Sequence, residues 1–508
     1  MKRINFIVVA LSMLLLVACS SSRKAFDPAR KYDPATLQKD YSLFRNILEE
    51  YHPSLYWFTP KDSIDYYFDN GLAQLSDSLT ELQFRYLLQN VASKFRCGHT
   101  SVRSSKKYSK YLDTAKLSLF PIALKIFPDS MAVIGNANRR DSILRRGTVV
   151  YSINGKSTRE LTDTFFNYLV TDAWSVNGKY QALSTGGNFG SLYRNIFGLA
   201  PTFNIEYEDS LGNRRFTNVP IFTPERDTAK RISSTTSPSA PPPPPRTTPA
   251  PRSVRINQFR NLQIDTTLST GYMTLNTFSR GNKLRSFYKK SFKQLRKHKI
   301  RHLVVDVRSN GGGDANLSTL LTRYLADHKF KLADSLYAIR RSGNYNKYIN
   351  KHFFYRFGML FVAKKYSDNK YHFRHFEKHY FKPKDKNHFY GDVYIITGGN
   401  SFSATTLFAK VLQGQKNVTV VGEETGGGNY GNTAWMIPEV TLPNTHIRFR
   451  LPLFRLVMDK EAVAAGRGII PDISVAPSPE TIRRNIDPKS QRVRDMIIEK
   501  NKLAGIKR

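Results

Sequence analysis

The chain has 508 residues, enough for two or three domains that each bury their own core. Its 78 Lys and Arg residues outnumber 40 Asp and Glu residues, which gives a formal net charge of +38. There are only two cysteines, Cys19 and Cys97, which excludes a disulfide-rich fold and a cysteine-based zinc site. The basic residues are scattered among aromatic ones rather than gathered into a nucleic-acid-binding motif, so we interpret them as a solvated surface that could face a membrane.

The first residues have the pattern of an export signal. Lys2 and Arg3 precede an apolar run over 6–18 that is too short to span a bilayer. Residues 16–19, Leu-Val-Ala-Cys, resemble a bacterial lipoprotein cleavage site, so we predict a signal peptide at 1–19 and lipidation of Cys19. The alternative is a secretory signal with a chance cysteine. Lipidation would tether the protein to the bacterial cell envelope, and we expect the periplasmic side of the outer membrane.

Residues 20–110 are predicted to form a polar tether and an N-terminal helical domain. Asp33 and Pro34 suit the cap and first turn of a helix, and apolar residues then recur at helical spacing as far as Tyr51. A second helix begins at Thr80, which can form a capping box with Gln83. That helix ends near the sequence Cys97-Gly98-His99, in which Gly98 suits a C-cap and Cys97 a buried thiol.

Residues 115–225 change to short strands and are predicted to form a PDZ-like β domain. Residues 147–155 resemble the PDZ segment in which a strand ends in an Asn-Gly turn. PDZ modules bind chain ends by strand addition, which suits a protein that holds peptides. The alternative is an ordinary β hairpin, and a glycine- and aromatic-rich insertion at 177–200 weakens the match.

A proline-rich linker is predicted at 230–255, because it contains five consecutive prolines at 241–245. Residues 256–480 then alternate strands and helices, which indicates an α/β layer structure. Residues 481–508 are predicted to be a basic C-terminal tail.

A basic, aromatic insertion at 328–390 interrupts the α/β pattern. It contains His372, His375 and His379, whose spacing does not match the His-Glu-x-x-His arrangement of zinc peptidases. We therefore predict a surface lid over a functional site rather than a metal site.

Ser403 lies where a strand passes into a helix. Residues 393–397 read as a buried strand, two glycines turn the chain, and residues 404–412 read as a helix. An oxyanion forming beside Ser403 would meet unpaired backbone N–H groups at the helix start. The alternative is that Ser401 or Ser403 only caps the helix.

Residues 302–314 form a second buried strand that runs into three glycines, which permit close backbone approach. Together, LVVDVRSNGGGD, NSFSATTLFAKVLQ and VVGEETGGG, in this order, resemble the C-terminal processing (tail-specific) serine peptidases and their tricorn-like relatives. The resemblance covers about residues 35 to 475 and implies a multidomain α/β (α+β) fold with a ClpP/crotonase-like catalytic core at 256–480. It also implies that Ser403 is the nucleophile and that the amides of Gly311, Gly312 and Ala404 form the oxyanion hole.

One position departs from the tail-specific pattern, because the family's lysine base is replaced by Gly428. Lys410 lies two helical turns from Ser403, about 10 Å away, and is a poor substitute. The tricorn-like branch uses an N-terminal histidine, which implies His99 as the base, although Gly98 stands where tricorn has a supporting serine. For a further catalytic carboxylate the resemblance implies Glu461, which precedes the closing motif at 468–472; Glu423 and Glu424 are rivals, and a solvated carboxylate is the alternative.

The sequence therefore predicts a lipid-anchored serine endopeptidase of the cell envelope that needs no cofactor or metal. The expected substrate is a protein or peptide, cleaved near its C-terminus, and no nucleic-acid partner is expected. The alternative is a non-catalytic peptide- or lipophilic-ligand-binding protein on the same fold.

Overall fold

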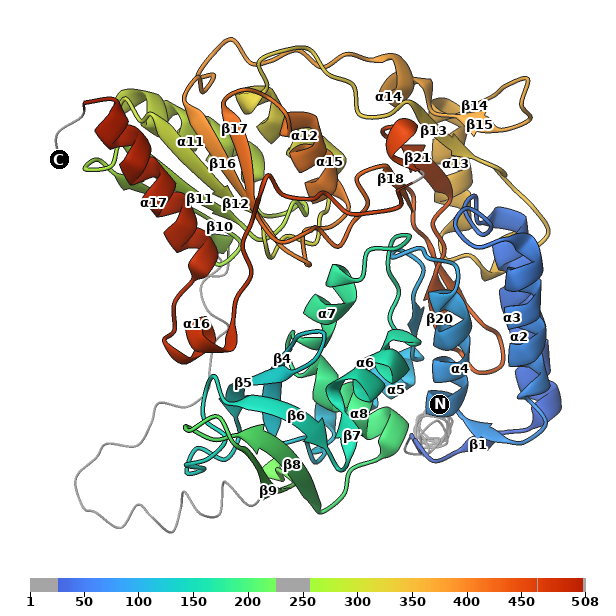
Figure 1. Cartoon of the computed structure of the whole chain (residues 1–508). Helices are drawn as coiled ribbons and strands as arrows, with labels where there is room; N and C mark the ends of the chain where they lie inside the picture. Colours follow the sequence, from blue (N-terminus) through green and yellow to red (C-terminus); the bar gives the residue numbers. More distant parts are fainter. Residues whose placement is uncertain (1–25, 225–255, 464, 506–508) are drawn as a thin grey trace, which may run out of the picture.

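The computed structural model describes residues 26–224, 256–463 and 465–505 (Figure 1). It confirms the predicted mixed α/β fold, in which helices cover a mainly parallel sheet beside a separate antiparallel β region. The predicted signal peptide, Cys19 and the whole proline-rich linker lie outside the described residues. Within them, no helix combines the length and apolar character needed to cross a bilayer.

The main sheet has the strand order β10-β11-β12-β16-β17-β22. Its first two strands are antiparallel and all other neighbours are parallel. The strands are β10 (Arg260–Asp265), β11 (Thr270–Leu275), β12 (His302–Asp306), β16 (Asp392–Thr397), β17 (Val418–Gly422) and β22 (Ile473–Ser474). Because β12 and β16 are parallel neighbours, the loops that follow them leave the same edge of the sheet.

The central strands β12 and β16 contain continuous apolar runs whose successive side chains point to opposite faces, so the sheet is covered on both faces. Leu303 and Val305 of β12 belong to the large core shared with α11 (Leu284–Lys297), α12 (Ala315–Leu325) and α15 (Ala404–Leu412). Val304 faces the other side, where it packs with Val493 and Ile497 of α17 (Pro488–Leu503). Figure 1 shows α17 crossing that face.

The prediction of a basic tail at 481–508 is therefore wrong for most of that segment. It contains the end of α16 (Pro479–Arg483) and all of α17, whose apolar residues cover the sheet. Lys489 is 4 % exposed and donates to the carboxylate of Glu423 and to the carbonyl of Thr397. The segment is rich in Lys and Arg, but it forms a helix with one buried face.

The insertion at 328–390 builds most of a second sheet, in the order β14-β15-β13-β21-β18. Its elements are β13 (Ser335–Ala338), η1 (Asn346–Tyr348), α13 (His352–Val362), β14 (Lys364–Lys365), β15 (Tyr371–His372) and α14 (Arg374–Lys378), joined by β18 (Gly431–Ala434) and β21 (Phe454–Val457). The antiparallel pairing of β13 with β21 thus joins the insertion to the rest of the fold.

The N-terminal helices share the large core rather than enclosing one of their own. They are α2 (Pro34–Tyr51), α3 (Lys61–Ala73) and α4 (Glu81–Ser93), followed by α5 (Lys106–Thr114), with β1 (Lys31–Tyr32) and β2 (Leu79–Thr80) forming a small ribbon. The Asp33 cap and the Thr80–Gln83 capping box are both present, as predicted. β3 (Val102–Arg103) pairs with β20 (Arg448–Arg450), which in turn pairs with β19 (Glu439–Thr441).

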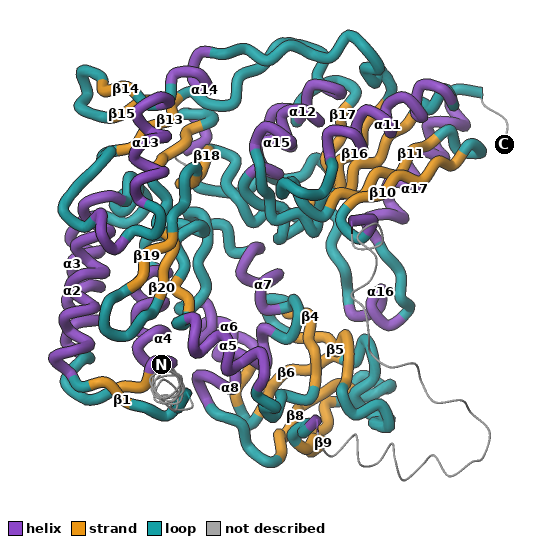
Figure 2. The backbone as a smooth tube through the Cα atoms, turned by 180° about the vertical axis from the view of Figure 1, so that it is seen from behind, coloured by secondary structure: helices purple, strands orange, loops and turns teal. Residues whose placement is uncertain are grey.

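The β region has the strand order β4-β5-β6-β8-β9 and its own core. Its strands are β4 (Ile122–Ile126), β5 (Met131–Asn136), β6 (Val149–Ile153), β7 (Lys156–Ser157), β8 (Thr202–Glu208) and β9 (Arg214–Pro220), and its helices are α6 (Thr158–Phe166), α7 (Asn177–Leu183) and α8 (Asn188–Phe197). The predicted insertion at 177–200 thus consists largely of two helices. Figure 2 shows the strands of this region apart from the main sheet.

Candidate active site

Two loops at the carboxyl edge of the main sheet are joined by hydrogen bonds around Ser401. Ser401 donates to the carbonyl of Val307, which follows β12, and accepts from the amide of Gly398, which follows β16. The carbonyl of Asn310 accepts from the Phe402 amide at 3.1 Å and from Thr405 Oγ1 at 2.9 Å. We call residues 398–403 the nucleophile turn. Its position follows directly from the pairing of β12 with β16.

The side chain of Ser403 does not cap the helix that it precedes. It stands at the N-cap position of α15 without a side-chain capping bond, and its φ and ψ are 57° and −122°. A positive φ is costly for a residue with a Cβ atom and persists only where the surroundings impose it, as at many functional sites. The capping alternative is therefore not what the structure shows for Ser403, and Ser401 has the structural role.

His99 lies in a turn after α4 that long-range contacts hold in place. We call residues 96–101 the histidine turn. The Gly98 amide donates to Asp172 Oδ1 at 2.7 Å, and the Arg450 amide of β20 donates to the Ser101 carbonyl at 3.0 Å. Thr100 is fully buried, and its Oγ1 lies 2.8 Å from His52 Nε2, within hydrogen-bond distance. The turn lies against the peptide that contains Ser403, since a Cβ at Gly98 would lie 2.5 Å from the Phe402 ring.

The Ser54 amide donates to His52 Nδ1, so His52 Nε2 carries the proton that it gives to Thr100 Oγ1. Thr100 Oγ1 in turn donates to Cys97 Sγ at 3.3 Å. Cys97 is buried and free, in keeping with the predicted buried thiol. A chain of hydrogen bonds therefore runs beneath His99.

The structure places His99 Nε2 3.1 Å from Ser403 Oγ. The His99 side chain is only 4 % exposed, and its ring packs against Phe402 with ring centroids 4.8 Å apart. Burial, with a smaller contribution from the positive charge of Arg450, lowers the pKa of His99 to about 3. The imidazole is therefore neutral at physiological pH and can accept the hydroxyl proton of Ser403.

Two of the three predicted oxyanion donors have a free backbone N–H group in the described structure. Among the described residues, the amides of Gly311 and Ala404 donate to no acceptor, and Ala404 is the first residue of α15. The prediction is wrong for the Gly312 amide, which donates to Asn310 Oδ1 at 2.9 Å. Gly312 is needed for another reason: a Cβ there would lie 2.7 Å from the Phe402 carbonyl oxygen and 2.8 Å from Ser403 Cβ.

The structure does not bring Glu461 to the histidine. Glu461 is exposed in η2 (Glu461–Val463), and within the described ranges His99 Nδ1 is buried without a hydrogen-bond partner. Among the rivals, Glu423 pairs with Lys489 and Glu424 pairs with Arg467. Lys410 forms an ion pair with Asp459 at 3.0 Å. The pair of Ser403 and His99 is therefore what the fold assembles from the predicted side chains.

Tyr430 fills the space beside Gly428, the position of the family's lysine. A Cβ at Gly428 would lie 2.4 Å from Tyr430 Cε1, and Tyr430 is 1 % exposed. Nearby, Asp172 is 2 % exposed, and one of its carboxylate oxygens has no partner in the described structure. Burial raises the pKa of Asp172 to about 7, although hydrogen bonds from the amides of Gly98 and Gly428 oppose the rise.

A cavity of about 710 Å³ opens beside Ser403, and we call it the active-site cavity. Its wall mixes apolar and polar side chains and comes from the insertion, α15, β18 with the segment that follows it, and residues 279–280 and 313–316. The apolar side chains are Phe373, Phe376, Leu407, Trp435, Met436 and Ile437. The insertion predicted as a lid thus forms one wall of this cavity. Ser279, Arg280 and Asn316 give one part of the cavity a polar lining.

The three insertion histidines are partnered in other ways. His372 forms ion pairs with Asp368 and Glu377, while the rings of His375 and His379 stack with centroids 4.8 Å apart. No group of three or more His, Cys, Asp or Glu side chains in the described ranges is arranged to hold a metal ion.

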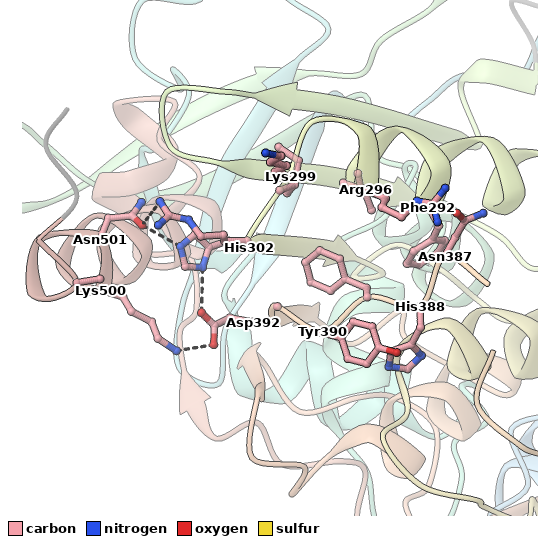
Figure 3. A pocket seen from close by; sticks show the side chains of 16 residues that line it. Phe292, Arg296, Lys299, His302, Asn387, His388, Tyr390, Asp392, Lys500 and Asn501 are labelled. Atoms are coloured by element: carbon pink, nitrogen blue, oxygen red, sulfur yellow. Dashed lines mark hydrogen bonds and ion pairs between the residues drawn. The ribbon is translucent and has the colours of Figure 1, made fainter. Parts of the chain in front are cut away.

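A second cavity, of about 580 Å³, lies at the opposite edge of the main sheet (Figure 3). It is lined by His302 and Asp392, the first residues of β12 and β16, and by Lys500 and Asn501 of α17. Figure 3 shows His302 and Lys500 both joined to the Asp392 carboxylate. Ligands of parallel sheets bind at the carboxyl ends of the strands, so this cavity is unrelated to the chemistry at Ser403.

Sequence reasoning missed the residues that support the two turns. Asn310 Oδ1 accepts a hydrogen bond from the Gly312 amide, and Asp172 Oδ1 accepts one from the Gly98 amide. The charge of Arg450 contributes to the lowered pKa of His99. Only Asn310 had a signal in the sequence, since it directly precedes the three glycines and asparagine often bonds to an amide two residues on.

Comparison with known proteins finds one family match and several solved structures with a similar fold. Residues 269–475 match the model of peptidase family S41. A CPAF variant structure superposes with a TM-score of 0.62 at 12% identity, covering 91% of this chain and 96% of that one. Mature CPAF complexed with lactacystin gives a TM-score of 0.59 at 13% identity, covering 91% and 98%. These likenesses establish a shared fold, and no curated protein matches the sequence. The chain is therefore a serine peptidase that carries a family S41 domain at residues 269–475.

Proposed function

We propose that Ser403 and His99 are the catalytic pair of this peptidase. The observation that carries the assignment is the 3.1 Å approach of His99 Nε2 to Ser403 Oγ, where Ser403 lines a cavity that offers both apolar and polar side chains. In the reaction, Ser403 Oγ attacks the peptide carbonyl carbon while its proton passes to Nε2, and the same nitrogen then returns the proton to the leaving amine. Water hydrolyses the acyl-enzyme in a second, equivalent round.

The amides of Gly311 and Ala404 are the proposed oxyanion donors. They belong to the two loops that Asn310 and Ser401 hold together, so their positions are set before a substrate arrives. Such preorganised donors act without reorganisation at the moment of reaction, and the loss of one such donor costs about 10²- to 10³-fold in kcat.

The cavity points to a peptide with a large apolar side chain next to the scissile bond. Aromatic and aliphatic walls favour such a side chain by removing its surface from water. Cleavage near substrate C-termini, with the β region holding the chain end, is the corresponding substrate-level proposal. A lipidated Cys19 would place this activity at the bacterial cell envelope, on the periplasmic side of the outer membrane.

Labelling with a fluorophosphonate probe tests the catalytic pair, because the probe reacts with an activated serine hydroxyl. We expect wild-type protein to be labelled, Ser403→Ala to be unlabelled and His99→Ala to be labelled far more slowly. Lys410→Met is the matched control. Its ion pair with Asp459 is partly exposed and involves neither Ser403 nor His99, so labelling should stay at the wild-type rate.

The alternative of a non-catalytic binding protein predicts a different outcome. Folded wild-type protein would then resist the probe, and Ser403→Ala would bind peptides as the wild type does. Loss of labelling in Lys410→Met with normal labelling in His99→Ala would overturn the choice of base. Circular dichroism spectra of all variants establish that each is folded.

A further inference from the structure

Helix α13 presents an unusual amount of apolar surface to solvent. Five of its eleven residues are large apolar side chains that are at least half exposed: Phe353 at 63 %, Phe354 at 71 %, Phe357 at 52 %, Leu360 at 50 % and Phe361 at 72 %. Isolated exposed apolar residues are ordinary, but a contiguous group marks an interaction surface. Figures 1 and 2 both place α13 at the periphery of the molecule.

The exposed residues form a ridge along one side of the helix. Phe353, Phe357 and Phe361 follow one another at four-residue spacing, which aligns them on a single face. The ring centroids of Phe353 and Phe357 are 6.2 Å apart, and those of Phe357 and Phe361 are 4.9 Å apart. Met359, 1 % exposed, holds the opposite face in the core. The ridge is therefore a convex, ordered feature of the folded protein.

Unpaired positive charges surround this ridge. Lys351, Arg356, Lys364 and Lys365 are exposed, and none forms an ion pair with any residue that the structure describes. The sequence from Ser335 to Ser367 contains no Asp or Glu. An aromatic ridge bordered by cations and free of acids is the composition of helices that lie in the headgroup region of anionic membranes.

The charge distribution selects among possible occupants. A second copy of the chain, docked ridge to ridge, would bring two sets of unpaired cations together, and like charges across an interface are unfavourable. An anionic bilayer pairs those cations with lipid phosphates, and it accepts a convex ridge without a complementary groove. We propose that α13 docks into the surface of an anionic bilayer, with its phenylalanines below the headgroups.

Docking in this way would orient the catalytic cleft relative to the bilayer. α13 packs near the wall of the active-site cavity, since a Cβ at Gly358 would lie 3.5 Å from Cε of Met436. The proposal is independent of the catalytic assignment and of lipidation at Cys19. A lipid chain would only bring the protein near the surface, whereas α13 would place a specific face in it.

Depth-dependent fluorescence quenching tests the proposal with the full chain. Phe357→Trp is reconstituted on vesicles of phosphatidylcholine and phosphatidylglycerol, with and without brominated acyl chains. Interfacial helices insert about 5–10 Å, so the added emission should shift to shorter wavelength and be strongly quenched by the brominated lipid. Wild-type protein, with its three native tryptophans, gives the background.

Phe216→Trp is the matched control, because Phe216 is 66 % exposed on β9 of the β region. Its emission should be unquenched on the same vesicles. Adding Lys364→Glu and Lys365→Glu to Phe357→Trp, or raising the salt concentration, should reduce quenching. Equal quenching at 216 and 357, or none at 357, would overturn the proposal. If the protein self-associates without vesicles and Phe357→Ser abolishes that self-association, the ridge would instead bind a second copy of the chain.

Discussion

The two turns of the proposed active site are built in different ways. The nucleophile turn is held by neighbours in the same sheet, because β12 and β16 pair directly and Ser401 and Asn310 bind their loops together. The histidine turn depends on distant partners, namely β20, Asp172 and the buried His52. The first turn is a product of the α/β layer itself, whereas the second is correct only when the N-terminal helices are docked.

This difference separates two requirements of catalysis. A reactive serine at a helix start needs only local geometry, but its proton acceptor comes from 304 positions earlier in the chain. Changes at the nucleophile turn should therefore act on the reaction itself. Changes at the histidine turn should act through the placement of a side chain, with the serine left intact.

The largest expected effect comes from removing either reactive group. Ser403→Ala and His99→Ala should each lower kcat roughly 10⁴- to 10⁶-fold, and the double variant should be no worse than the single variants, because the two residues act as a unit. Steady-state kinetics with a fluorogenic peptide measure this. Losses that multiply in the double variant would mean that the two turns work independently.

A smaller loss is expected from crowding the nucleophile turn. Gly312→Ala would place a methyl group 2.7 Å from the Phe402 carbonyl oxygen at a φ of 97°, which displaces the loop that carries the oxyanion donors. We expect about 10²- to 10³-fold lower kcat. Gly281→Ala is the control, since it has a similar φ of 90° but open space, so it should affect only stability. Equal kinetic losses in both variants would contradict the assignment.

A paired comparison of two buried threonines sharpens the contrast between the turns. Thr100→Val removes the acceptor of His52 in the histidine turn. Thr405→Val removes one of the two donors to the Asn310 carbonyl, beside the nucleophile turn. Each should cost about 1–3 kcal/mol of unfolding free energy. Only Thr100→Val should also lower kcat/KM, by about tenfold, because His99 is then less well placed. If Thr405→Val were the more damaging to kcat/KM, the contrast would fail.

The smallest effect concerns the pH dependence of stability. Burial lowers the pKa of both His99 and His52 to about 3 and raises that of Asp172 to about 7. Between about pH 4 and 6 the unfolded chain binds two protons on the histidines, and the folded chain binds one on Asp172. These groups should therefore reduce the unfolding free energy by about 1.4 kcal/mol for each unit that the pH falls.

Asp172→Asn removes the proton that the folded chain binds and that offsets one of the two histidine protons of the unfolded chain. The unfolding free energy of the variant should therefore change with pH about twice as steeply over the same range. Denaturant unfolding at several pH values between 4 and 6 compares the two proteins. Parallel curves for the variant and the wild type would show that Asp172 is already ionised in the folded protein.

The contrast between the turns also explains what the sequence could predict. The α/β order, the strand before Ser403 and the three glycines follow from local patterns, because buried parallel strands are continuous apolar runs. His99 could be placed only through a family resemblance, since neither turn contains information about the other. The partners of Gly98 and of the Gly312 amide depend on side-chain positions that no local pattern determines.

Two further differences have physical causes. Residues 481–508 were misread because their cations outweigh a buried stripe of only a few apolar residues, among them Val493 and Ile497. Glu461 was chosen from sequence proximity to a motif, but the chain after β21 turns its carboxylate towards solvent. In both cases composition and distance along the chain were poor guides to burial.

The pairing of β3 with β20 also sets the moment at which a newly made chain becomes reactive. A ribosome delivers His99 early and Ser403 late, but the strand that anchors the histidine turn ends at Arg450. Synthesis or export interrupted before that point would yield a polypeptide that contains both reactive residues and is inert. The order of the elements thus delays assembly of the Ser403–His99 pair until β20 has been made.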